Sequence, residues 1–134
     1  MKFTIVLAAL ATAVVAQETA TPVFEFQNFA ASCAADSELC TFSFTLNGVN
    51  CTASDRAFPA TVLGVAYKKL PNIGQTGCGK IAWSGVRGAD EVYSISGRTL
   101  GAGGQGGGAA IPASDFTIRD GVEAYTGTGT IDLL

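Results

Sequence analysis

Apolar and polar residues alternate with a period of two in several segments of the chain. In residues 23–29, Phe24 and Phe26 share one face of an extended chain, and in residues 41–46 every second position is Phe or Leu, with Thr or Ser between. This alternation predicts half-buried β-strands. The Asn47-Gly48 pair that follows is typical of a tight hairpin turn.

Further segments rich in strand-forming residues lie between clusters of Gly, Pro, Asn and Asp. They are residues 61–67, which read as one strand, and residues 81–84, 92–96, 116–118 and 122–126. No segment after the N-terminal region predicts a helix. The pattern therefore predicts an all-β fold, an antiparallel β-sandwich or barrel of about seven short strands.

Residues 101–108 form a low-complexity tract with six glycines in eight positions. Such a tract has few side chains to bury and a large entropy cost of ordering, so we expect a surface loop. A phosphate-binding glycine loop would lead into a helix and usually into Lys followed by Ser or Thr, and this tract does neither.

The N-terminus has the pattern of a cleavable signal peptide. Lys2 precedes an apolar run of about thirteen residues that ends in small residues, which predicts cleavage after Ala16. The run is shorter than the roughly 20 residues that span a bilayer, so no membrane anchor is predicted. We expect a secreted, extracellular single domain over residues 17–134, with residues 17–22 as a frayed N-terminus.

Four cysteines follow the predicted cleavage site: Cys33, Cys40, Cys51 and Cys78. An even number in an exported small domain predicts two disulfides, for which three connectivities are possible. Pairing of Cys33 with Cys40 is favoured, because the two flank a short turn between strand-like segments, and this leaves Cys51 with Cys78.

Charge and composition argue against several classes of function. The chain has a net charge of −3 and no histidine. An acidic chain does not favour nucleic acid as a partner, and the absence of histidine excludes Ser-His-Asp and Cys-His catalysis and histidine-based zinc sites. The sequence therefore predicts no cofactor and no metal.

Carboxylates are the remaining source of hydrolytic chemistry, since a glycosidase needs a pair of them. The candidates are Asp90-Glu91, Asp115 and Asp120-Glu123. Each lies in a segment rich in Gly, Ser or Thr, where Asp is a normal turn residue, so we expect turn and solubility roles for them.

Two further features bear on glycans. Asn50-Cys51-Thr52 matches the N-glycosylation pattern, although oxidation of Cys51 competes with its use. Trp83, with Tyr67 and Tyr93, could stack on a sugar, but a place in the core is the favoured prediction for the tryptophan.

The segment Phe24–Cys33, followed by Ser37–Phe44 with Cys40 and then by Cys51, resembles a pattern in small secreted fungal proteins. It is similar to the family of the Alternaria major allergen, which includes elicitors of plant defence and candidate effectors. The resemblance covers the first half of the mature chain. It implies an exported, disulfide-bonded β-barrel or sandwich that binds a host component, in a family without an established catalytic mechanism. This chain departs from the allergen in having no cysteine after Cys78, so neither the allergen's connectivity nor a partner surface transfers.

These observations predict a non-enzymatic effector or elicitor that binds a host component, acting as a monomer or homodimer. Residues 34–39, 71–79 and 101–109 would be loops displayed on a rigid sheet framework. The partner would be a host extracellular protein or a cell-wall glycan. The alternatives are a carbohydrate-binding domain or carboxylate-based glycosidase using Trp83, and a cell-wall-associated protein, with which the glycine-rich tract is compatible.

Overall fold

The computed structural model describes residues 22–134, so the predicted signal peptide (1–16) and most of the predicted frayed segment (17–22) lie outside the described residues. The described chain is all-β, as predicted, with one short 3-10 helix, η1 (Ala113–Asp115). The strands are β1 (Phe24–Cys33), β2 (Leu39–Leu46), β3 (Val49–Arg56), β4 (Phe58–Val62), β5 (Val65–Lys69), β6 (Ile73–Cys78), β7 (Ile81–Arg87), β8 (Tyr93–Thr99), β9 (Gly106–Ile111), β10 (Phe116–Arg119), β11 (Val122–Tyr125) and β12 (Ile131–Leu133). Within residues 22–134 no helix is long and apolar enough to cross a membrane.

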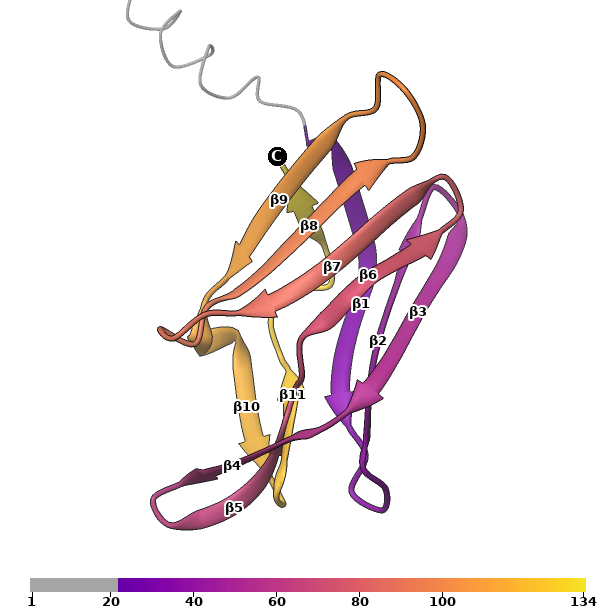
Figure 1. Ribbon diagram of the computed structural model, residues 1–134. Helices are drawn as coiled ribbons and strands as arrows, with labels where there is room; N and C mark the ends of the chain where they lie inside the picture. Colours follow the sequence, from indigo (N-terminus) through magenta and orange to yellow (C-terminus); the bar gives the residue numbers. More distant parts are fainter. Residues whose placement is uncertain (1–21) are drawn as a thin grey trace, which may run out of the picture.

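The strands form two sheets that face each other across one core (Figure 1). The larger, a half-barrel, has the order β3-β2-β1-β11-β5-β4, with β10 added on β11 and β12 on β1, and the smaller has the order β6-β7-β8-β9. Along one side the sheets are joined by backbone hydrogen bonds in both directions between Gly108 of β9 and Leu134, at 3.1 and 3.0 Å. Along the other side the Cys51–Cys78 disulfide links β3 to β6.

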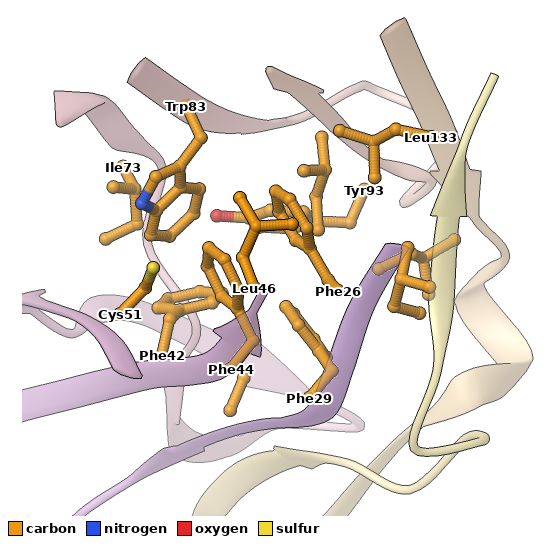
Figure 2. Close-up of a cluster of buried hydrophobic side chains, with 14 of the residues drawn as sticks. Phe26, Phe29, Phe42, Phe44, Leu46, Cys51, Ile73, Trp83, Tyr93 and Leu133 are labelled. Atoms are coloured by element: carbon orange, nitrogen blue, oxygen red, sulfur yellow. The ribbon is translucent and has the colours of Figure 1, made fainter. Parts of the chain in front are cut away.

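The core is dominated by aromatic side chains, as the alternation in residues 23–29 and 41–46 predicts (Figure 2). Phe26 stacks on Phe44 with ring centroids 3.8 Å apart, and Trp83 packs edge-on against Phe44 at 5.2 Å. The rings come from both sheets. Burial of these large side chains is the main stabilising contribution, since apolar burial contributes about 25 cal/mol per Å².

Both predicted disulfides are present. Cys33 pairs with Cys40, and Cys51 pairs with Cys78. Cys33 and Cys40 are register partners on β1 and β2, so their disulfide staples one hairpin, whereas the other joins the two sheets.

The prediction of one strand over residues 61–67 is wrong. The chain reverses at Leu63-Gly64, where φ is +51° and +80°, and β4 and β5 form a hairpin. Two positive φ values define a type I′ turn, which Asn47-Gly48 and Asp120-Gly121 also form. Leucine is unfavourable at the first position of this turn, so the residue pattern did not predict the turn.

The predicted loop at 71–79 is largely a strand, and the predicted loop at 101–109 is partly one. Residues 73–78 form β6, and residues 106–108 of the glycine tract begin β9. A Cβ on Gly107 would stand 3.2 Å from backbone atoms of Leu133 and Leu134. Part of the tract is therefore glycine because the C-terminal segment packs against it, and the loop itself is confined to residues 100–105.

Candidate functional site

The largest concentration of buried charge lies between the β4–β5 hairpin and the end of β7. Two hollows of about 140 and 400 Å³ adjoin here and share Lys69, Arg87 and Glu91 in their walls. We call this site the charged cleft. The larger hollow is also lined by Tyr67, Phe116, Ile118, Glu123 and the alanine, threonine and valine side chains of residues 60–62.

A buried ion pair forms the floor of the charged cleft. Arg87 Nη1 lies 2.8 Å from Glu123 Oε1 and donates to Oε2 at 3.1 Å, and both side chains are less than one-tenth exposed. The Leu70 N–H donates to the same Oε1 at 2.9 Å. Glu123 is 5% exposed, so within residues 22–134 this acidic residue is buried with the core. The prediction that it serves a surface turn is therefore wrong.

The opposite edge of the Arg87 guanidinium has no protein partner. Its Nε and Nη2 atoms are buried and donate to no acceptor within residues 22–134. The guanidinium carbon lies 4.6 Å from the Phe116 ring centroid and 5.5 Å from that of Tyr93. Stacking on aromatic rings stabilises the cation but satisfies neither N–H donor.

Glu91 stands at the rim of the charged cleft in a costly backbone conformation. It has a φ of +67° in the tight turn between β7 and β8, a region that favours Gly or Asn. Its carboxylate forms an ion pair with Lys69 Nζ at 2.5 Å and lies 3.7 Å from Arg87 Nη1. The contacts of Glu91 with Lys69 and Arg87 thus offset the conformational cost.

The β4–β5 hairpin beside the charged cleft carries exposed apolar side chains. They are Phe58 (60% exposed), Val62 (42%), Leu63 (97%) and Val65 (64%). The hairpin lies at the end of the molecule away from the C-terminus (Figure 1) and joins β11 through the register pair Lys68 with Val122. We call these four side chains the apolar arm.

The predicted sugar-stacking residues are not available as a platform. Trp83 is 1% exposed and Tyr93 is fully buried, where its hydroxyl donates to the Pro71 carbonyl at 2.8 Å. Burial raises the pKa of the Tyr93 hydroxyl. Tyr67 is half-buried and lines the charged cleft. The core placement favoured for Trp83 is confirmed.

The candidate carboxylates separate into two groups. Glu91 and Glu123 meet around Arg87, whereas Asp90 Oδ1 accepts from the Val92 N–H within its own turn. Asp115 closes the 3-10 helix, and Asp120 begins a hairpin turn. Asn50 is exposed on β3, where its Oδ1 accepts from Thr45 Oγ1 at 3.2 Å.

The predicted surface loop 34–39 is held in place by hydrogen bonds from Lys68. Lys68 Nζ donates to the carbonyls of Ala34, Ala35 and Ser37 at 3.2, 3.2 and 2.6 Å. Its distance to Glu38 Oε2 is 3.6 Å. The loop is therefore fixed against β5.

Sequence reasoning missed Lys69, Arg87 and Leu63 as site residues. For the two cations no local signal exists, because their partners lie on other strands. For Leu63 the signal was weak, because only the glycine of the Leu-Gly pair fits the residue preference of a type I′ turn.

Comparison with known proteins gives no match for this chain, whether to family models, to curated proteins or to solved structures.

Proposed function

We propose that this protein is a secreted, non-enzymatic effector or elicitor that binds a host extracellular protein, in a plant, through the apolar arm. The resemblance of its first half to the Alternaria allergen family supports the host setting. The signal-peptide pattern and the two disulfides support export.

The observation that carries the proposal is the state of Leu63. Its side chain is 97% exposed and its φ is +51°, so it contributes neither burial nor a favourable turn to the fold. The left-handed conformation costs an ordinary residue roughly 1–2 kcal/mol, a cost that Asn largely avoids. The two other type I′ turns use Asn and Asp at the same position. A leucine at this position therefore supports a role in binding at the protein surface rather than in folding.

The arm has the chemistry of a protein interface. Exposed aliphatic and aromatic side chains cluster on one short hairpin, and interface cores are rich in such residues and poor in charge. The sugar-stacking alternative loses its main residue, because Trp83 lies in the core.

The test uses purified full-length secreted protein infiltrated into leaf tissue, with capture of apoplastic host proteins as a second readout. Wild type triggers a defence response and retains a host protein, and Leu63→Asn weakens both at least tenfold while folding at least as stably. Leu63→Met keeps the apolar tip and keeps both activities. Val86→Thr, which changes an exposed valine on the other sheet, serves as the matched control.

A wild-type protein that causes no response and binds no host protein at any dose would overturn the proposed function. Equal activity of Leu63→Asn and wild type would show that the apolar arm is not the binding surface.

A further inference from the structure

The segment Asn50-Cys51-Thr52, which matches the acceptor pattern for an N-linked glycan, lies within β3 and divides its side chains between the two faces of the sheet. Asn50 and Thr52 are exposed, whereas Cys51 is 2% exposed and lies in the core (Figure 2), where it pairs with Cys78. Successive side chains of a strand point to opposite faces, so the extended backbone itself produces this division. The acceptor residues and the disulfide therefore do not compete for space in the folded protein.

A hydrogen bond to the amide oxygen of Asn50 leaves its amide nitrogen available. Thr45, the register partner of Asn50 on β2, donates from Oγ1 to Asn50 Oδ1 at 3.2 Å. This bond turns the oxygen toward β2. Nδ2, the atom that carries an N-linked sugar, is the other end of the amide and takes no part in the bond. β3 is also the last strand on its side of the larger sheet, so no further strand of that sheet lies beyond Asn50.

The outward face of the sheet around Asn50 suits a neutral sugar. Two adjacent register rows across β1, β2 and β3 hold uncharged residues, Gln27, Thr45 and Asn50 in one and Ala30, Ser43 and Thr52 in the other. A sugar that lies on these rows buries no charge, and the Ser and Thr hydroxyls both donate and accept hydrogen bonds.

The position of β3 also separates this face from the apolar arm. β3 begins at the end of the molecule opposite the β4–β5 hairpin (Figure 1), and Asn50 is its second residue. A glycan on Asn50 therefore leaves the apolar arm uncovered.

The order of synthesis gives glycosylation precedence over oxidation of Cys51. Cys33 and Cys40, which are made earlier, pair with each other, so the partner of Cys51 is Cys78. Cys78 follows by 27 residues, which takes about 1–5 s at about 5–20 residues per second. Disulfide formation then needs seconds to hours. The competition between the two modifications is thus one of timing, and Asn50 is available first.

We propose that Asn50 carries an N-linked glycan in the secreted protein, attached before Cys51 pairs with Cys78 and present together with that disulfide in the folded molecule. The co-substrate is an oligosaccharide on a lipid diphosphate. The bond from its anomeric carbon to the diphosphate breaks, the bond from that carbon to Nδ2 forms, Nδ2 gives up one proton, and the lipid diphosphate leaves. This inference rests on the export contained in the proposed function, and not on a host target.

The experiment secretes the full chain, residues 1–134, from yeast and compares the intact mass of the purified protein before and after the glycan-cleaving amidase PNGase F. The amidase lowers the mass of wild type, and peptide mapping then finds Asp at position 50. Mapping without reduction finds Cys51 joined to Cys78 in the glycosylated molecules. Residues 17–134 behind a standard secretory leader are produced in parallel and carry the same glycan.

Variants test the acceptor pattern and the timing. Thr52→Ala removes the hydroxyl that the pattern requires and abolishes the glycan, whereas Thr52→Ser keeps both. Ser43→Ala, at the register partner of Thr52, leaves the glycan unchanged. Cys78→Ala removes the partner of Cys51 and is glycosylated to the same extent as wild type. The two variants of the exposed Thr52 decide the question if Cys78→Ala is not secreted.

Secreted wild type without an N-linked glycan, from either leader, would overturn the proposal. A glycan on Cys78→Ala but not on wild type would also overturn it, because oxidation of Cys51 would then come first. So would a glycan confined to molecules that lack the Cys51–Cys78 disulfide.

The two proposals fail separately. Protein that reaches the medium only behind the standard leader, with a glycan on Asn50, supports the glycan site and counts against the export in the proposed function. Secreted protein that lacks the glycan but still triggers the leaf response supports the proposed function and overturns the glycan site.

Discussion

Arg87 of β7 and Glu123 of β11 form an ion pair between the two sheets, with Nη1 and Oε1 2.8 Å apart and both side chains nearly inaccessible to water. The same Oε1 accepts the Leu70 N–H just after β5. One carboxylate thus joins the end of β7 in the smaller sheet and the base of the β4–β5 hairpin to β11.

Removing that carboxylate should be strongly destabilising. Glu123→Ala leaves the Arg87 cation and the Leu70 N–H buried without a partner, and we expect the free energy of unfolding to fall by about 3–5 kcal/mol. Urea denaturation followed by tryptophan fluorescence measures it, with the exposed Asp132→Ala as control.

The double variant Arg87→Met with Glu123→Leu should recover much of the loss, because it removes both charges together. A cost below about 1 kcal/mol for Glu123→Ala would show that water reaches the site.

The sequence predicts the parts of this fold in which one strand's own pattern decides the outcome. Phe42, Phe44 and Leu46 are buried as their alternation predicts, and Asn47-Gly48 turns as its chemistry predicts. Leu63-Gly64 was missed because leucine is rare at the first position of a type I′ turn and strand-forming residues flank the pair. The second half of the glycine tract was missed because its need for glycine comes from the distant Leu133 and Leu134 backbone.

The charged cleft was beyond prediction for the same reason. Arg87 and Glu123 are 36 residues apart in the chain, and their pairing depends on how β7 is placed against β11. The sequence supplied Glu91 and Glu123 as acidic candidates, but it could not show that they meet at one arginine. Local periodicity identifies which residues are buried, whereas side-chain pairing between sheets follows from the tertiary fold.

Tyr93 should make stability fall at alkaline pH. Burial raises the pKa of its hydroxyl above the ordinary value of 10.0, so the folded protein keeps a proton that the unfolded chain releases. This contribution is complete below pH 10 and is lost as the pH rises from there toward the folded-state pKa. In Tyr93→Phe we expect a loss of about 1 kcal/mol at pH 7, from the missing hydrogen bond to the Pro71 carbonyl, and a smaller loss at pH 11.

Urea midpoints of wild type and Tyr93→Phe at pH 7, 9, 10 and 11 measure how the stability difference between the two proteins shrinks as the pH rises. Tyr67→Phe, at a half-buried tyrosine, is the control. A difference between wild type and Tyr93→Phe that is constant with pH would contradict the assignment.

The two disulfides should contribute unequally. The Cys51–Cys78 bridge closes a loop of sequence separation 27 and the Cys33–Cys40 bridge one of 7, which gives about 3.6 and about 2.4 kcal/mol in the chain-entropy model. We therefore expect the double alanine variant at 51 and 78 to lose at least about 1 kcal/mol more than the one at 33 and 40. Thermal unfolding of both variants compares them, and equal losses would mean that the link between β3 and β6 adds nothing beyond a short hairpin staple.

Gly107 should be intolerant of any side chain, because the C-terminal segment packs on its backbone. A Cβ there would stand 3.2 Å from the Leu133 carbonyl carbon and oxygen and from the Leu134 oxygen, which are backbone atoms that cannot rotate away. Gly107→Ala therefore pushes the chain end off β9 and weakens the paired hydrogen bonds between Gly108 and Leu134. We expect a loss of about 1–3 kcal/mol, as for other overpacked sites.

Hydrogen exchange distinguishes this mechanism from general destabilisation, because the Gly108 and Leu134 amides should lose protection before those of β2 and β7. Gly77→Ala is the control, since a Cβ on this β6 glycine meets nothing within 4 Å. It should change stability by less than about 0.5 kcal/mol. If Gly107→Ala were equally silent, the contact between Gly108 and Leu134 would contribute little to holding the two sheets together.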